Sequence, residues 1–352
     1  MSYPRIELDC AKIHFNTQLL IDKLTLKGIN VTPVTKSCLG HPIIANTLIN
    51  AGATMLADSR VNNIKRMRDA GITVPTLLIR SPMLSQIESV VAYCDISLNT
   101  EIAVMRKLSE AALRCHRIHQ VIIMVELGDL REGVMPGNLV HLVKDVIKLP
   151  NIKLKGIGAN LTCRYGVEPD DINMQLLSDL AEQIEITFSL KLDIISGGNS
   201  GSINWALAYQ GQTRINHLRL GEAVFLGLVP KNQPQISGLS STAITLTAEV
   251  IESSQKPSYP WGNRGVNAFG ETASLQNRGQ VNQAILALGR QDVCVDGLHP
   301  PSGMTIVSSC SDHLMVETAD QILAVGETVT FGLAYSAFLS AMTSEFVDKI
   351  YQ

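Results

Sequence analysis

The sequence predicts an α/β protein in which a (β/α)8 barrel is followed by a smaller C-terminal all-β domain. Eight short apolar runs alternate with helix-like stretches over about 200 residues, which matches the strand number and the length of a closed barrel. After about residue 230 the helical pattern gives way to strand-like runs separated by Gly and Pro. Glycine-rich loops follow the seventh and eighth runs, which is where such barrels commonly bind phosphate.

Composition narrows the class of protein before any motif is considered. The chain has 352 residues, of which 45% are hydrophobic and 17% charged, as in a protein with a large buried core. A net charge of −3 gives no basic surface for nucleic acid or an anionic membrane, and no apolar run has the length of a membrane span or a signal peptide. Seven cysteines without a CxxC pair suggest neither a disulfide framework nor a metal site. We therefore expect a reduced, cytoplasmic protein.

The elements of the barrel follow from hydrophobic periodicity. Residues 1–10 contain an alternating strand that we expect to pack with the β domain, and a helical pattern over 11–26 opens the barrel domain, predicted at 11–232. The eight barrel strands are predicted at 30–36, 54–57, 76–79, 95–98, 121–125, 154–158, 192–196 and 215–220. Helices are predicted between them at 43–50, 60–70, 84–92, 100–115, 138–148 and 170–189. An open doubly wound sheet is the alternative, but its glycine fingerprint after the first strand is missing.

The C-terminal domain is predicted at 240–352 and is expected to be built from strands alone. Its pattern consists of short apolar runs punctuated by Gly and Pro, with little helical spacing. The predicted strands cover 243–251, 283–289, 304–310, 314–317 and 328–331.

Lys36 is the first candidate for chemistry, because it ends the first barrel strand. Desolvation at the end of a buried strand lowers the pKa of an amine and makes it a better nucleophile toward a carbonyl group. The alternative is an ordinary lysine whose side chain reaches solvent from a strand end. The loops after the last two predicted strands decide between these two interpretations of Lys36.

Two loops are predicted to bind phosphate. Three glycines with Asn199, Ser200 and Ser202 follow the seventh strand, and a second loop with Gly221 and Glu222 follows the eighth. A lysine on the first strand facing a phosphate site on the last two is the arrangement that a pyridoxal phosphate (PLP) enzyme needs.

At this point the chain resembles the fold type III PLP enzymes of the alanine racemase type, and within them the ornithine racemase-like branch. The resemblance rests on motifs spread over nearly the whole chain: Thr35-Lys36, residues 57–60, 126–133, 156–163, 196–200, 219–222, 289–293, 311–313 and 341–344. It implies that Lys36 carries PLP and that Ser200, Gly221, Glu222 (through its backbone amide) and Tyr335 surround the phosphate. It also implies a homodimer with shared active sites.

Arg219 separates two reaction types within this resemblance. Racemases of the family place an arginine against the pyridine nitrogen, whereas its decarboxylases place a carboxylate there. Because arginine keeps its proton in proteins, the ring nitrogen stays unprotonated and the ring withdraws electrons less strongly, which favours proton exchange at Cα over loss of CO2. The alternative is a salt-bridged structural arginine.

Racemisation needs a second base on the face of Cα opposite Lys36. The family uses a tyrosine in a Gly-Tyr-Ala-Asp-Gly stretch, but the matching residues here, 289–293, contain none. The candidates left open are Asp292, His313, Cys310 and Cys163, each of which also has a plain structural interpretation.

For the substrate, Arg131 matches the arginine that approaches the phenolic oxygen of the cofactor or the substrate carboxylate. Asp129 and Glu132 beside it are candidates to bind the distal amine of ornithine or lysine, or to hold Arg131. The sequence thus predicts a PLP-dependent racemase of a basic amino acid, ornithine before lysine or arginine. The alternatives are a decarboxylase of the same fold and a non-catalytic PLP-binding protein.

Overall fold

The chain is described here from a computed structural model, which covers residues 2–230, 232–267, 269–270, 276–319 and 322–352. It divides into two compact units, Cys10–Ser241 and a second one formed by Met1–Asp9 with Thr242–Gln352. The first unit is the barrel and the second is built around an antiparallel sheet. Each unit is described by itself.

The barrel unit has eight parallel strands in the order β2-β9-β8-β7-β6-β5-β4-β3. They are β2 (Asn30–Pro33), β3 (Leu56–Asp58), β4 (Thr76–Leu78), β5 (Ile96–Asn99), β6 (His119–Met124), β7 (Ile152–Gly158), β8 (Ile194–Ser196) and β9 (His217–Leu220). A parallel bridge between Val34 and Ala57 brings the first and last strands of this order together, so the sheet is nearly closed. The predicted barrel fold is confirmed.

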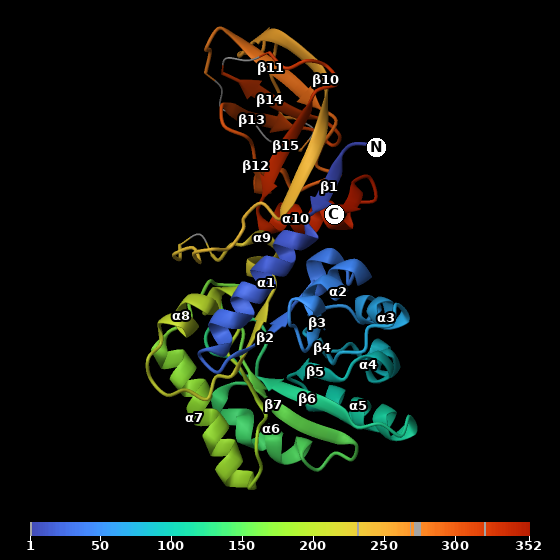
Figure 1. Cartoon of the computed structure of the whole chain (residues 1–352), viewed down its shortest axis with the longest axis vertical. Helices are drawn as coiled ribbons and strands as arrows, with labels where there is room; N and C mark the ends of the chain where they lie inside the picture. The colour runs from blue at the N-terminus through green and yellow to red at the C-terminus, as the bar shows by residue number, and fades with distance from the viewer. Residues whose placement is uncertain (1, 231, 268, 271–275, 320–321) are drawn as a thin grey trace. The chain divides into compact units, whose positions relative to one another are not determined.

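Helices cover the outer side of these strands, as Figure 1 shows for α3, α4 and α5 beside β3 to β6. The helices of this unit are α1 (Cys10–Thr25), α2 (Pro42–Asn50), α3 (Val61–Asp69), α4 (Ile87–Tyr93), α5 (Ile102–Arg114), α6 (Leu139–Val146), α7 (Asp171–Phe188), α8 (Ile203–Ala208) and α9 (Glu222–Leu226). Alternating strands and helices keep every strand parallel, so that the carboxyl ends of all eight lie at one end of the barrel.

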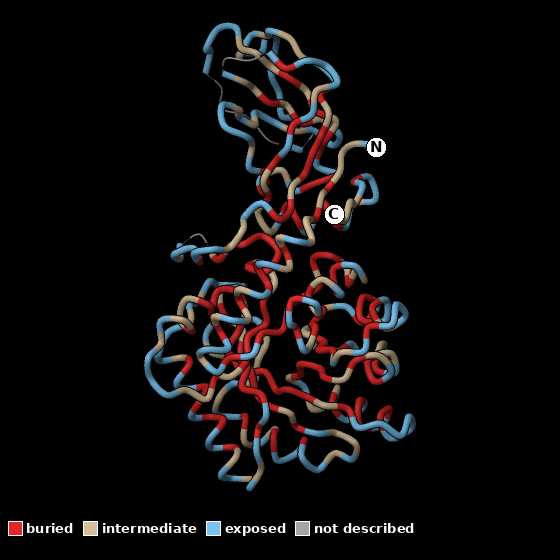
Figure 2. The backbone as a smooth tube through the Cα atoms, viewed as in Figure 1, coloured by how far each residue is buried: buried red, intermediate tan, exposed pale blue. Residues whose placement is uncertain are grey.

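The barrel interior is filled by apolar side chains from many strands. One buried cluster comprises Val34, Ala57, Leu77, Ile96, Leu98, Ile122, Met124 and Ile194. Figure 2 shows the same strands as continuous buried segments. Because side chains alternate along a strand, residues two positions from these, such as Thr32 and Ser196, also face inward. The interior is therefore a packed core and any site must lie at its end.

The second unit contains the sheet β12-β15-β10-β11-β14-β13, in which successive strands are antiparallel. β1 (Arg5–Leu8) joins it by pairing antiparallel with β10 and parallel with β16. The other strands are β10 (Ile244–Pro257), β11 (Gln280–Leu286), β12 (Leu298–His299), β13 (Met304–Ser309), β14 (Leu314–Thr318), β15 (Thr328–Leu333) and β16 (Asp348–Tyr351).

Three details differ from the sequence prediction. Helix α10 (Tyr335–Thr343) lies in the unit expected to contain strands alone, and β12 and β16 were missed. The helix has neither a proline nor a side-chain cap at its start, and the two strands have only two and four residues, so the local pattern gives little to indicate them. The first barrel strand ends at Pro33 and not at Lys36, because the chain turns into the 3-10 helix η1 (Thr35–Cys38).

Candidate functional site at the carboxyl ends of the barrel strands

Lys36 is held on a tight turn just beyond β2. The Thr35 hydroxyl donates to Asp58 Oδ2 over 2.7 Å and to the Ala57 carbonyl over 3.1 Å, which ties the turn to the end of β3. Gly40 closes the turn at φ +60°, where a Cβ atom would lie 2.7 Å from the Asn63 carbonyl oxygen. The turn thus presents Lys36 at the end of the barrel where the strands finish.

Asp58 is the acidic residue beneath this turn, and its side chain is fully buried. Besides Thr35, its carboxylate accepts from the backbone N–H of Arg60 at 2.8 Å and from Asn63 Nδ2 at 3.0 Å. Burial raises the pKa of Asp58, while these hydrogen bonds lower it. The sequence analysis placed Asp58 in a motif but missed its role, because an acid after a strand gives no signal of what it supports.

The amine of Lys36 lies among polar groups that lie on, or in the loops after, four other strands. Burial lowers its pKa most, the charges of Arg131 and Arg219 lower it further, and Cys163 and Asp58 act in the opposite sense. A larger fraction of the amine is therefore unprotonated near neutral pH than for a surface lysine, which favours attack on a carbonyl group.

The loop after β6 carries Arg131 and Glu132. Nε and Nη2 of Arg131 both donate to the Glu132 carboxylate, and Nη1 lies 2.9 Å from Cys163 Sγ. Burial alone would lower the pKa of Arg131, but the Glu132 carboxylate raises it overall. The guanidinium is thus fixed as a cation beside the thiol.

Asp129 holds the loop that bears Cys163. Its carboxylate accepts four backbone N–H groups, from Cys163 at 3.2 Å, Arg164 at 2.8 Å, Tyr165 at 3.1 Å and Val167 at 3.2 Å. Although burial acts to raise the pKa of Asp129, these bonds lower it. Both oxygens are committed to this clamp, so direct contact of Asp129 with a substrate stays a prediction that this geometry does not favour.

The loops after β8 and β9 meet. Asn199 Oδ1 accepts from the Gly201 N–H at 2.8 Å and its Nδ2 donates to the Leu161 carbonyl at 2.7 Å. The hydroxyl of Ser200, 4% exposed, accepts from the Ala223 N–H at 3.2 Å, directly after Gly221 and Glu222. The two glycine-containing loops predicted to share a phosphate therefore lie side by side.

Glu222 also presents a side chain that the sequence analysis did not use. Burial raises the pKa of its carboxyl, and the positive charge of Lys36 lowers it. The Glu222 carboxyl group therefore lies close enough to Lys36 for an electrostatic interaction between them.

Arg219 lies on β9 and is 4% exposed. Its Nη1 donates to the Ser196 hydroxyl and its Nη2 to the Ala159 carbonyl at 2.8 Å. Burial lowers its pKa to about 10, which still leaves the group charged at neutral pH. Next to it, Asn160 Nδ2 is buried and has no hydrogen-bond partner among the described residues.

Four predicted residues belong to the second unit and are described within it. Asp292 Oδ2 accepts from the Gly289 N–H at 2.7 Å, and burial raises its pKa. His313 Nδ1 lies 2.9 Å from Asp312 Oδ1, and Cys310 is exposed. Tyr335 is the first residue of α10. Their predicted contributions to the site at the barrel stay predictions.

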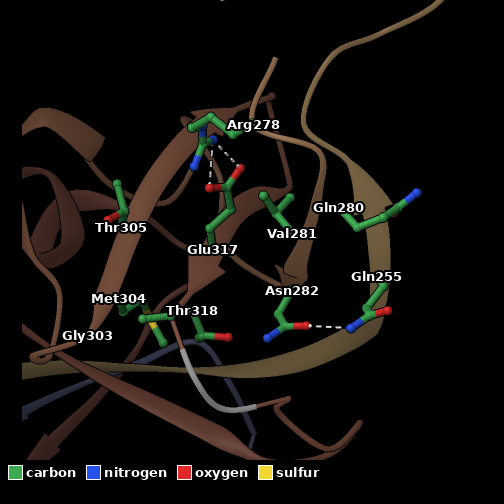
Figure 3. Close-up of a pocket in the computed structure, with 11 residues that line it drawn as sticks. Gln255, Arg278, Gln280, Val281, Asn282, Gly303, Met304, Thr305, Glu317 and Thr318 are labelled. Carbon is green, nitrogen blue, oxygen red and sulfur yellow. Dashed lines mark hydrogen bonds and ion pairs between the residues drawn. The ribbon is translucent and has the colours of Figure 1, made fainter. Parts of the chain in front are cut away.

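The second unit also contains a polar hollow of about 580 Å³ (Figure 3). Arg278 Nη2 lies 2.8 Å from Glu317 Oε2 there, and Gln255 Nε2 donates to Asn282 Oδ1 at 3.3 Å. Because the Arg278 and Glu317 charges neutralise each other, we assign the hollow no function. Within the described ranges, no group of three or more His, Cys, Asp or Glu is arranged to bind a metal ion, and no helix is long and apolar enough to cross a membrane.

The family match of this chain covers nearly all of the barrel unit, whereas two curated relatives match nearly the whole chain. The family model "Alanine racemase, N-terminal domain" matches residues 8–229. The ornithine racemase of Acetoanaerobium sticklandii is 38% identical over 99% of both chains, and the lysine racemase of Thermotoga maritima is 35% identical over 100% of this chain and 99% of its own. An alanine racemase structure from Bacillus anthracis aligns with 100% of this chain and 96% of its own at a TM-score of 0.75 and 18% identity. A D-threonine aldolase from Filomicrobium marinum aligns with 98% and 90% at a TM-score of 0.72 and 18% identity, so these two similarities concern the fold.

Proposed function

Since this chain belongs to the alanine racemase family, we propose that it is a PLP-dependent racemase of a basic amino acid, with Lys36 as the residue that holds the cofactor. The observation that carries the proposal is the gathering of Lys36, Arg131, Cys163 and Arg219 where the barrel strands end. Bound there, PLP would withdraw electrons from Cα of an amino acid and make its proton acidic.

The residues present suit this cofactor. The joined loops at Ser200 and Gly221 would hold the phosphate, with the Ser200 hydroxyl already turned toward the loop after β9. Arg219 supplies a buried cation for the ring nitrogen, and Asn160 Nδ2, which has no partner among the described residues, offers a further donor. A polar group buried without a partner costs about 1–3 kcal/mol, so such a group indicates a missing ligand or water.

Lys36 would hold the cofactor through its amine and, once the substrate amine has taken its place, would act as a base at Cα. Its lowered pKa supports both roles, because each needs the unprotonated amine. Asp58 and Thr35 would keep the turn in place while the amine moves its proton.

For the second base, we propose Cys163 ahead of the other three candidates. The Asp129 clamp and the contact of 2.9 Å with Arg131 fix its sulfur among the charges around Lys36. A cysteine sulfur in this place could take up a proton from Cα and give one back. Asp292, Cys310 and His313, from the second unit or from that of a second copy, are the alternatives.

Arg131 and Glu132 are proposed to select the substrate. The planar guanidinium suits a substrate carboxylate, and the Glu132 carboxylate would either hold Arg131 or meet a distal ammonium group. The full-length similarity to an ornithine racemase and a lysine racemase supports a basic substrate, with ornithine first. We also propose the homodimer, which light scattering of the purified protein would test.

A chiral assay over the L- and D-forms of ornithine, lysine, arginine and alanine, with purified protein and added PLP, tests this function. We expect ornithine to racemise fastest, and Lys36→Ala to abolish turnover and visible PLP absorbance. Lys155→Ala is a matched control, because Lys155 pairs with Asp193 at 2.9 Å near the opposite end of the barrel. Release of CO2 would instead identify a decarboxylase, and bound PLP without exchange of the Cα proton would identify a carrier.

A further inference from the structure

Four polar side chains form a hydrogen-bonded chain inside the apolar barrel. Thr32 Oγ1 lies 2.8 Å from His217 Nε2, His217 Nδ1 lies 2.7 Å from Ser196 Oγ, and Arg219 Nη1 donates to that same oxygen. None of the four is more than 4% exposed: Thr32 2%, Ser196 0%, His217 3% and Arg219 4%. Buried polar groups in such a core are costly unless they are paired, so this chain is a feature that needs an explanation.

The direction of the chain follows from the donors and acceptors available. Arginine can only donate, so the Ser196 oxygen accepts from Arg219. Either atom of the Ser196 Oγ–His217 Nδ1 pair can donate, and we assign the serine as the donor because the described residues offer its proton no other acceptor. This assignment leaves the His217 proton on Nε2, facing the Thr32 hydroxyl. In this order the imidazole of His217 accepts from the Ser196 hydroxyl, whose oxygen accepts from the Arg219 guanidinium.

A charged imidazole is disfavoured at this position. Burial lowers the pKa of His217 to about 3, and the positive charge of Arg219 acts in the same direction. Arg219 faces His217 across Ser196, and the Ala159 carbonyl at 2.8 Å binds its second terminal nitrogen. The guanidinium is therefore anchored from two sides, which restricts a long side chain that has many rotamers.

We propose that His217 is a positioning residue for Arg219: as a neutral ring protonated on Nε2, it accepts the Ser196 proton and so fixes the guanidinium at the ring nitrogen of the cofactor. This rests on the proposed function, because Arg219 needs a fixed orientation only if it faces a ring. Without the acceptor at His217, the Ser196 hydroxyl is free to turn, and the hydrogen bond that it accepts from Arg219 is no longer fixed in direction.

The first arm of the test reads the imidazole directly, in the protein without PLP. NMR of protein labelled with 15N-histidine, assigned by the signal missing from His217→Leu, is expected to show Nε2 protonated, Nδ1 unprotonated and no titration between pH 5.5 and 9. A proton on Nδ1, or titration in this range, would overturn the proposal. Because no cofactor is used, this arm gives its answer even if the proposed PLP enzyme fails.

The second arm measures kcat, KM and the pH dependence of the visible PLP spectrum. We expect His217→Leu to lower kcat at least tenfold with little change in KM and to alter the spectrum, and His217→Asn, which keeps an acceptor near Ser196, to recover part of both. His119→Leu is the matched control: His119 is 2% exposed and lies 2.8 Å from Ser97 Oγ, but it begins β6 at the opposite end of the barrel. A folded His217→Leu with unchanged kcat and spectrum, or the same changes in His119→Leu, would refute the proposal. If His217→Leu fails to fold, the signal is assigned with His217→Asn.

Discussion

Replacing Asp129 by Asn should open the loop that carries Cys163 while the barrel stays folded. Oδ2 accepts from the N–H groups of Cys163 and Arg164, and Oδ1 from those of Tyr165 and Val167. An asparagine keeps one acceptor oxygen and turns an NH2 group toward the other two N–H donors. Two hydrogen bonds to a charged group are lost, each worth about 1.5–3 kcal/mol.

The loop amides regain water when the loop opens, so we take the lower limit, about 3 kcal/mol for the two bonds. Since every 1.4 kcal/mol is tenfold, amide exchange protection over 163–167 should fall about 100-fold. Hydrogen exchange read by mass spectrometry measures this directly, and racemase activity should fall with it. The control is Asp95→Asn, because Asp95 accepts from the Thr76 N–H at 2.8 Å at the start of β5, away from the loop.

Two outcomes would refute this reasoning: unchanged protection over 163–167 in a folded Asp129→Asn, or an equal loss in Asp95→Asn. The pH dependence offers a second check. The pKa of Asp129 is lowered in the folded loop, so its stabilisation is complete above the ordinary carboxyl value of about 3.9 and is lost as the pH falls through the lowered value. Wild-type protection should therefore persist down to about pH 4.

Three further predictions concern other groups of the barrel unit. Thr35→Val removes the hydroxyl bonded to Asp58 and should lower stability by about 1.5–3 kcal/mol in urea titration; an unchanged midpoint would contradict this. The pKa values of His217 and His119 are lowered to about 3 and about 4, mainly by burial, so the unfolded chain binds more protons below pH 6.5. Stability should then fall by up to about 1.4 kcal/mol per pH unit for each histidine as the pH drops below 6.5, and His217→Leu should reduce this slope. Cys163→Ser should lower racemisation at least about 100-fold while proton exchange with one enantiomer persists, and full retention of racemisation would exclude Cys163 as a base.

Much of the barrel could be predicted, because its strands are buried and read as short apolar runs of the right number. The position of Lys36 and the two glycine-containing loops followed from this count, since parallel strands bring their carboxyl ends together. Arg131 became a candidate through the resemblance to the alanine racemase-type enzymes, since nothing in the local sequence pattern indicates it.

The other features of the site could not be predicted, because they depend on contacts between residues that are far apart in the sequence. Thr32 and His217 are bonded across 185 positions of sequence, and a histidine in an apolar run gives no sign of its partner. Asp129 was a candidate to bind a distal amine or to hold Arg131, and no local pattern indicates that its fully buried carboxylate accepts four backbone amides. Helix α10 was missed because it begins without a proline or a capping side chain, among segments that form strands.

The central claim is that the amine of Lys36 bonds the cofactor. Borohydride reduction of the PLP-loaded protein, followed by peptide mapping with mass spectrometry, tests it directly. We predict a pyridoxyl group on the peptide that contains Lys36 and on no other lysine. Its recovery on a different lysine, or a protein whose PLP washes away after reduction, would contradict the account.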